Sequence, residues 1–376
     1  MTDTLQDMMR EATRLTQAGN LSDATALIQR ALSGSKAPLT LAAPANSTHQ
    51  PATEATVAAA VIDGVVLNRS MESDSPSARS TGAGEFITST HTHAGLTRSY
   101  KLYIPPNATG HAPPLVVMLH GCTQNPDDFA AGTDMNARAR EQGFFVLYPA
   151  QSQDANAQRC WNWFGRAHQQ RGSGEPALIA DLTQAVMLKF GIDRERVYIA
   201  GLSAGGAMAD IVAAAYPEIY AAVGIHSGLP RGAATNVAAA FAVMKNGDPP
   251  SSSSSSPAAS IREAAVPTIV FHGDADQTVH PRNGEQVIAA LLRRVPSNEA
   301  TQTTGVVPGG HTYTRTTYRD QQSRSFAEHW LVKDANHAWS GGSAKGSYTD
   351  SSGPDATAEM LRFFFEHPLQ IRAAVR

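Results

Sequence analysis

Residues 197–217, VYIAGLSAGGAMADIVAAAYP, place a serine at the centre of a run of small residues. The first five letters have the continuous apolar character of a buried strand, and residues 204–217 that of an alanine-rich helix. The stretch predicts a nucleophile elbow, in which a sharp strand-to-helix turn raises the Ser203 hydroxyl above the sheet. Gly201 and Gly205 fit this turn, because it forces the chain close together there and a side chain at either position would collide.

The composition is that of an ordinary soluble globular protein. The 376 residues are 42% hydrophobic and 17% charged, with a formal net charge of −3, which suggests neither nucleic acid nor an anionic membrane as a partner. No apolar run approaches the roughly 18 residues of a membrane span. The N-terminal residues MTDTLQDMMREATR carry acids early and no apolar signal segment, so a cytoplasmic or granule-associated location is expected.

Strands and helices alternate along the chain from residue 84. An antiparallel pair is expected at 85–93 and 98–106, and a single helix near 127–142. Further apolar strands and helices alternate up to a closing helix at 355–367. This order predicts an α/β protein with a mostly parallel central sheet covered by helices on both faces, over residues 84–376.

Three other segments differ from this pattern. Residues 1–34 predict a helical hairpin, residues 35–83 a flexible Ala/Ser/Thr/Pro-rich linker, and residues 249–260 a low-complexity insertion. Two short amphipathic helices need another surface to cover their apolar stripes. That surface is the main domain, a second copy of the chain in a homo-oligomer, or an apolar polymer or granule.

A serine hydroxyl becomes a good nucleophile only when a base takes its proton and an acid orients that base. On this type of sheet the acid follows the serine in the chain, on a loop after a strand. The stretch IVFHGDADQTVHP (269–281) offers Asp274 and Asp276. Asp276 is preferred because it lies further out along the loop, whereas Asp274 is suited to hydrogen-bonding the turn.

The base should be a histidine after the acid. Five candidates follow, namely His280, His311, His329, His337 and His367. His337 is preferred because it lies late in the chain, between a strand and the last helix. His280 is the rival, although its position fits a loop–helix junction, and His329 alternates with apolar neighbours as a structural strand residue does.

Acyl transfer also requires donors for the developing oxyanion. One is expected to be the backbone N–H of Ala204, directly after the nucleophile. The other is expected from LHGCTQN (119–125), where Gly121 allows a turn and Cys122 presents its N–H. No cluster of Cys and His with metal-ligand spacing appears, so neither a metal nor another cofactor is expected.

Several motifs together resemble the polyhydroxybutyrate depolymerase family of esterases, a branch of the α/β-hydrolases that borders on feruloyl and acetylxylan esterases. They are HGCTQNPDDFA, CWNWF, YIAGLSAGGAMA, FHGDADQTVHP and NHAWSGGSAKGSYTDSSGPDATAEMLRFF, spread over roughly residues 84–370. The resemblance implies Ser203, Asp276 and His337 as the catalytic triad. It also implies the Cys122 amide as an oxyanion donor, and an extracellular location is the alternative because secreted members carry a signal peptide.

The resemblance further implies a disulfide between Cys122 and Cys160, which would brace the oxyanion loop; two buried free thiols are the alternative. The aromatic residues Trp161, Trp163 and Trp339 are candidates for contact with substrate, although core packing is the usual fate of such side chains.

The expected function is therefore a serine esterase acting on short-chain hydroxyalkanoate polyester or its oligomers, with a polyester granule as a candidate partner. The alternative within the same chemistry is a feruloyl or acetyl esterase acting on glycan or small-molecule esters. A binding protein that has kept the fold without catalysis is the non-enzymatic alternative.

Overall fold

The computed structural model describes residues 82–106, 112–247, 265–295, 297 and 299–370. The predicted hairpin at 1–34, nearly all of the predicted linker and the insertion at 249–260 lie outside the described residues.

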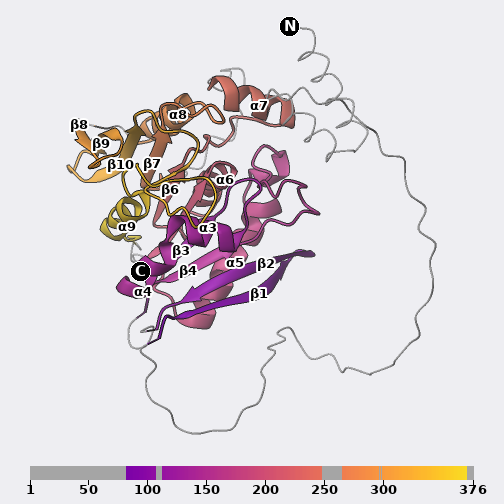
Figure 1. The fold of residues 1–376 in the computed structure, drawn as a ribbon. Coiled ribbons are helices and arrows are strands. Elements are labelled where there is room, and N and C mark those ends of the chain that lie inside the picture. The colour runs from indigo at the N-terminus through magenta and orange to yellow at the C-terminus, as the bar shows by residue number, and fades with distance from the viewer. Residues whose placement is uncertain (1–81, 107–111, 248–264, 296, 298, 371–376) are drawn as a thin grey trace, which may run out of the picture.

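Within the described part of the chain, ten strands form one sheet in the order β1-β2-β4-β3-β5-β6-β7-β10-β9-β8. Their bounds are β1 (Glu85–His93), β2 (Leu96–Ile104), β3 (Leu115–Leu119), β4 (Phe145–Pro149), β5 (Val197–Leu202), β6 (Ala222–His226), β7 (Thr268–Gly273), β8 (Glu299–Val306), β9 (Thr312–Arg319) and β10 (Ser325–Val332). The six strands from β4 to β10 run parallel, and antiparallel pairs extend the sheet at both ends. Figure 1 shows the β1–β2 hairpin and the β8–β9 hairpin at opposite ends of the molecule. The predicted mostly parallel sheet and its opening antiparallel pair are confirmed.

Helices cover both faces of the sheet, as predicted. One apolar core contains residues of α5 (Gly174–Phe190), α6 (Ala204–Ala215), α7 (Val237–Asn246) and α8 (Arg282–Leu292). The other contains residues of α3 (Pro126–Thr133), α4 (Met135–Gln142) and α9 (Ala356–Glu366). Alternate residues of β5 enter the two cores, with Val197 in the first and Tyr198 in the second. This alternation on a fully buried strand is why β5 is apolar throughout.

Two parts of the fold differ from the sequence expectation. The single helix predicted near 127–142 is divided into α3 and α4 by Asp134, whose φ of 53° lies in the left-handed region. A left-handed residue cannot continue a right-handed helix. The pattern also assigned no element to residues 299–319, where β8 and β9 form a hairpin. Most side chains of β8 are exposed, so this strand lacks the apolar alternation by which strands are recognised.

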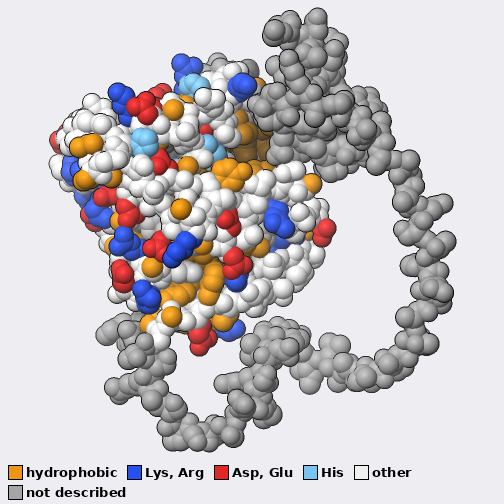
Figure 2. All heavy atoms as spheres, viewed as in Figure 1, with side chains coloured by type: hydrophobic (Ala, Val, Ile, Leu, Met, Phe, Trp, Pro, Cys, Tyr) orange, Lys and Arg blue, Asp and Glu red, His pale blue; other side chains and the backbone are white. Residues whose placement is uncertain are grey.

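The surface carries charges of both signs. On the face drawn in Figure 2, Lys and Arg side chains are interspersed with those of Asp and Glu. In residues that the structure describes, no helix is both long and apolar enough to span a bilayer. The same residues include no group of three or more His, Cys, Asp or Glu arranged to hold a metal ion.

Candidate active site

Ser203 lies at the turn between β5 and α6 and has the strained backbone of a nucleophile elbow. Its φ of 58° and ψ of −118° are unusual for a residue with a side chain, and its N–H donates to the carbonyl of His226 at 2.8 Å. A Cβ on Gly201 would lie 2.3 Å from the carbonyl carbon of Gly205. A Cβ on Gly205 would lie 2.0 Å from the carbonyl oxygen of Leu119. The predicted need for glycine at both positions is confirmed.

Asp276 and His337 are brought together from loops after β7 and β10. Oδ2 of Asp276 lies 2.7 Å from Nδ1 of His337, and Oδ1 accepts the N–H groups of Thr278 and Val279 at 2.9 and 2.8 Å. Burial alone would raise the pKa of Asp276, but the hydrogen bonds and charges of His272 and His337 outweigh it and hold that pKa well below its usual range. The carboxylate therefore stays ionised and fixes the imidazole of His337.

The rival acid and base have other roles in the structure. Asp274 is exposed, and its Oδ1 accepts the N–H of Asp334 at 2.6 Å, so it hydrogen-bonds the turn. His280 is also exposed, and its Nδ1 accepts the N–H of Arg282, the first residue of α8. It lies at the loop–helix junction that its sequence position suggested. His329 lies on β10, as expected of a structural strand residue.

Ser203 and His337 line the same cavity, whose volume is about 220 Å³. Most of its other walls are apolar and come from the segment after Cys160, from β5 and from α7; they are formed by Trp163, Phe164, Leu202, Val237, Ala240, Phe241 and Met244. The polar part of the wall comes from the loop after β3 and from Asn156, Thr278 and Tyr348. The cavity therefore suits an uncharged, largely apolar group next to Ser203.

The loop after β3 leaves the Cys122 N–H available for an oxyanion. The N–H groups on either side are taken, because Gly121 donates to Oε1 of Gln124 at 2.9 Å and Thr123 donates to the carbonyl of Gln158 at 2.6 Å. No acceptor among the described residues takes the Cys122 N–H. Ala204 is the first residue of α6, where N–H groups have no partner within the helix. The two predicted oxyanion donors are thus both free to bind a ligand.

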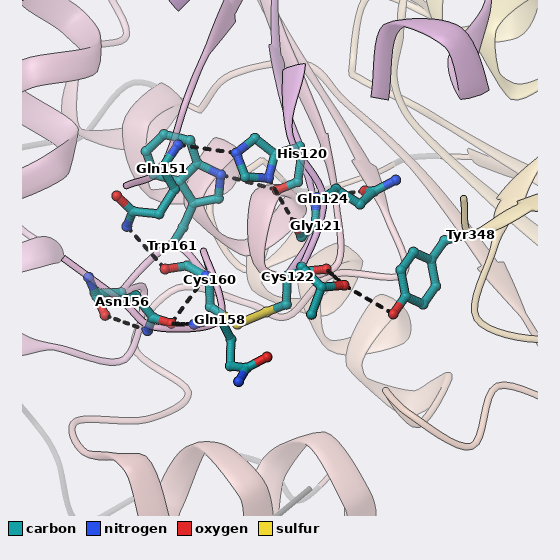
Figure 3. The surroundings of a disulfide bond; sticks show 12 residues. His120, Gly121, Cys122, Gln124, Gln151, Asn156, Gln158, Cys160, Trp161 and Tyr348 are labelled. Carbon is teal, nitrogen blue, oxygen red and sulfur yellow. Dashed lines mark hydrogen bonds between the residues drawn. A yellow bond between two sulfur atoms is a disulfide. The ribbon is translucent and has the colours of Figure 1, made fainter. Parts of the chain in front are cut away.

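A disulfide joins Cys122 to Cys160, the pair that the resemblance implied, and both cysteines line the cavity (Figure 3). The bond connects the loop after β3 to the segment that carries Trp161 and Trp163. Gln151 adds to this connection, because its Nε2 donates to the carbonyl of Cys160 at 3.0 Å. The loop after β3 is therefore joined covalently to the segment around Cys160.

A model of the esterase PHB depolymerase family matches residues 98–316, more than half of the chain. The chain belongs to this family. The poly(3-hydroxyalkanoate) depolymerase C of Paucimonas lemoignei is 33% identical over 202 residues, which cover 52% of this chain and 48% of that protein. The acetylxylan esterase A of Aspergillus ficuum is 28% identical over 195 residues, covering 48% of this chain and 62% of that protein. This chain thus spans about half to six-tenths of the length of these relatives.

The fold is that of the α/β-hydrolases. The acetyl xylan esterase from Aspergillus awamori superposes with a TM-score of 0.56 at 18% identity, covering 74% of this chain and 99% of that one. At this identity the likeness concerns the fold alone, and the order of strands and the elbow after β5 agree with it.

Two of the three tryptophans expected at the substrate have other positions in this esterase-family chain. Trp163 lines the cavity, but Trp161 and Trp339 are fully buried and do not. Nε1 of Trp161 donates to the carbonyl of His120 at 3.1 Å, and Nε1 of Trp339 donates to Oγ1 of Thr357 at 3.0 Å. Both therefore support the site from within the core. Their neighbours in the sequence do reach the site, which is why the sequence suggested that they would too.

Sequence reasoning also missed two histidines behind the site. His226 ends β6, accepts the N–H of Ser340 on Nε2 at 2.9 Å, and stacks on Trp339 with ring centroids 5.1 Å apart. Burial holds its pKa well below the usual range, so it is a neutral packing residue. His272 lies 3.4 Å from Oδ2 of Asp276 and 2.8 Å from the carbonyl of Val279, both through Nε2. Their position at the carboxyl ends of neighbouring parallel strands was the signal that could have identified them.

Proposed function

We propose that this chain is a serine esterase in which Ser203 is the nucleophile, His337 the general base and Asp276 the acid that orients it. The observation that carries the proposal is the 2.7 Å contact between Asp276 and His337, whose ring lines the cavity that also contains the elbow serine. The three residue types and their order along the chain match the arrangement used for acyl transfer on this fold.

In the proposed reaction, Oγ of Ser203 attacks the carbonyl carbon of the ester while its proton passes to Nε2 of His337. The bond to the alcohol oxygen then breaks, and this oxygen takes the proton from His337 as the alcohol leaves. Water attacks the acyl-enzyme, gives its proton to His337, and releases the acid while the proton returns to Ser203. Asp276 stays ionised throughout and stabilises the imidazolium.

The backbone N–H groups of Cys122 and Ala204 would stabilise the oxyanion of both tetrahedral intermediates. Support comes from their availability in the described part of the chain, where no acceptor takes the Cys122 N–H and the Ala204 N–H lies in the first turn of α6. The N-terminal end of α6 adds a partial positive charge next to the same position. This chemistry needs no metal or organic cofactor.

For the substrate we propose a short-chain hydroxyalkanoate polyester or its oligomers. The matched family and the 33% identity to a poly(3-hydroxyalkanoate) depolymerase support this class over the acetylxylan and feruloyl esterases, which are 26–29% identical. The apolar cavity walls also suit an aliphatic hydroxyacyl chain.

The test combines an active-site probe with a substrate panel. An alkyl fluorophosphonate, which loses fluoride from phosphorus as the serine oxygen attacks, should label Ser203 in the wild-type protein and leave Ser203→Ala unlabelled. Purified protein is then compared on hydroxybutyrate oligomers, acetylated xylan and methyl ferulate, with product acids quantified by chromatography. Labelling elsewhere, or turnover by Ser203→Ala, would refute the proposed nucleophile. A higher kcat/KM on acetylated xylan or methyl ferulate would refute the proposed substrate class and leave the esterase mechanism intact.

A further inference from the structure

Tyr348 is a large side chain at the cavity that remains exposed to solvent. It lies just before β12 (Thr349–Asp350), contributes to the cavity wall with Ser203 and His337, and has 46% of its surface accessible. Its φ of 51° lies in the left-handed region, which is costly for an aromatic residue. Strain of this kind persists only where the surroundings enforce it, and it is concentrated at functional sites.

The segment that carries Tyr348 is fixed to the loop after β3 and to the first turn of α3. Ser347 donates from its N–H to Oδ1 of Asp128 at 2.8 Å and from its hydroxyl to Oδ2 of the same residue at 2.5 Å. Nε2 of Gln124 donates to the carbonyl of Ser347 at 3.1 Å. These bonds hold the backbone directly before Tyr348 and compensate for its strained conformation.

The ring itself is oriented by its hydroxyl. Oγ1 of Thr123 donates to the carbonyl of Cys122 at 2.6 Å, so the Tyr348 hydroxyl is the donor in its 3.2 Å contact with Oγ1 of Thr123. Figure 3 shows the ring approaching this loop from the side opposite Cys160 and Asn156. The aromatic face is thus pre-positioned beside the expected oxyanion donor, and binding a substrate there costs little side-chain entropy.

The backbone of Tyr348 is bonded to the segment that directly follows His337, and both residues line the cavity. The N–H of Trp339, two residues after His337, donates to the carbonyl of Tyr348 at 2.7 Å, and β11 (Trp339–Ser340) pairs with β12. In acyl transfer the base must return its proton to the leaving oxygen, so the alcohol portion of the ester lies beside that histidine. The apolar wall of Trp163, Phe164 and α7 then remains for the acyl portion.

We propose that Tyr348 forms a subsite for the alcohol portion of the substrate, and that this portion is a further hydroxyacyl ester unit of an aliphatic polyester chain. The inference rests on the proposed esterase function and adds a preference for esters that continue beyond the leaving oxygen. The ring contacts the methylene and methyl groups of that unit. The alcohol portion of a methyl or ethyl ester is too short to reach the ring, so contact with Tyr348 adds nothing to the binding of such an ester.

The test uses two esters with the same 3-hydroxybutyryl acyl group. One is methyl 3-hydroxybutyrate; the other is the dimer methyl ester, whose cleavage at the internal bond releases methyl 3-hydroxybutyrate. Tyr348→Ala should lower kcat/KM for the internal bond of the dimer by about tenfold or more. It should change hydrolysis of the short methyl ester by less than about twofold, and Tyr348→Phe should restore most of the dimer activity, because it keeps the ring.

Phe241→Ala is the matched control, since it truncates an aromatic residue of α7, which belongs to the apolar wall left for the acyl portion. It should affect both esters equally, because they share the acyl group. If Tyr348→Ala lowered kcat/KM equally for both esters, or for neither, the proposed subsite would be refuted. A failure of the proposed esterase mechanism would give a different result from a failure of the subsite, because Ser203→Ala would then still hydrolyse the short ester.

Discussion

Gln124 accepts the N–H of Gly121 on Oε1 at 2.9 Å, and this bond fixes the residue directly before Cys122. The other end of the same side chain is also held, because Nε2 donates to Oδ2 of Asp128 at 2.9 Å and to the carbonyl of Ser347. Only 2% of Gln124 is exposed. A buried amide held at both ends cannot rotate without breaking bonds, so it sets the direction of the loop that presents the Cys122 N–H.

Replacing this amide should impair catalysis more than substrate binding. Gln124→Ala is expected to lower kcat by about tenfold or more with little change in KM, because the oxyanion exists only after attack. Gln184→Ala is the control, since Gln184 is exposed on α5 and should leave both parameters unchanged. Steady-state kinetics on a soluble ester measures both. A rise in KM at constant kcat would show that Gln124 supports ground-state binding instead.

The two aspartates after β7 should differ sharply in their contribution to activity. Asp276→Asn removes the charge that orients His337 and should lower kcat by about 10⁴-fold, as expected for the acid of a triad. Asp274→Asn keeps an acceptor for the N–H of Asp334 and should retain nearly normal turnover. Circular dichroism establishes that both variants are folded before their kinetics are compared. Similar losses in the two variants would contradict the assignment of the acid.

The sequence was most informative where the backbone itself limits the residue type. A Cβ on Gly201 would overlap the backbone of Gly205, and a Cβ on Gly205 would overlap the backbone of Leu119. The elbow could therefore be predicted from a few adjacent residues of the sequence. The order of strands and helices could also be predicted, because strands of the parallel sheet are buried on both faces and are therefore largely apolar. The roles of Asp274 and His280 also agree with their local context.

The sequence could not predict side-chain positions that depend on contacts with residues far away in the chain. Tyr348 meets Thr123 across 225 residues, and Gln124 meets Ser347 across 223, so no local pattern links them. The sequence makes Trp161 and Trp339 candidates for contact with substrate, because they lie close to Cys160 and His337 in the chain. The packing of the whole domain determines which side of a loop faces a cavity. In this domain that packing directs the indoles of Trp161 and Trp339 into the core.

Substitution of an elbow glycine should cost stability as well as activity. Gly205→Ala would place a Cβ 2.0 Å from the carbonyl oxygen of Leu119, so β3 and α6 would have to separate. The expected loss in free energy of unfolding is about 3 kcal/mol or more. Gly143→Ala is the control, because Gly143 has a φ of +73° but nothing within 4 Å of an added Cβ, and it should cost only about 1 kcal/mol. Urea unfolding measures both, and equal losses would contradict the steric explanation.

Reduction of the Cys122–Cys160 disulfide should lower both stability and turnover. Its sequence separation of 38 residues corresponds to a loss of about 4 kcal/mol in the chain-entropy description. Turnover should fall as well, because the loop with the Cys122 N–H loses its connection to Cys160. The double variant Cys122→Ser, Cys160→Ser should behave like the reduced protein and no longer respond to dithiothreitol. A reduced wild-type protein with unchanged kcat would show that hydrogen bonds alone hold the loop.

Acid should destabilise the fold, before the carboxylates titrate, through two histidines that the folded state keeps neutral. Burial lowers the pKa of His120 to about 4, and burial together with the charge of His272 lowers the pKa of His329 to about 4. In the unfolded chain both titrate near pH 6.5. Between these values the unfolded state binds protons that the folded state excludes, so the free energy of unfolding falls as the pH falls from about 6.5 toward 4. The slope is about 1.4 kcal/mol per pH unit for each such histidine.

His329→Leu tests this linkage, because the variant removes one of the excluded protons and leaves the active-site loops in place. As the pH falls, its free energy of unfolding should decline less steeply than that of the wild type. Near pH 5 the two slopes should differ by about 1.4 kcal/mol per pH unit, the contribution of one proton. Urea unfolding at pH values of about 7, 6 and 5 gives the slope for each protein. Only the difference between the slopes tests the linkage, because the change in packing shifts the free energy of unfolding at every pH. Parallel slopes for the two proteins would mean that His329 takes up its proton in the folded state as readily as in the unfolded chain. The depressed pKa of Asp276 acts in a separate window, since its contribution is lost only as the pH falls below about 4.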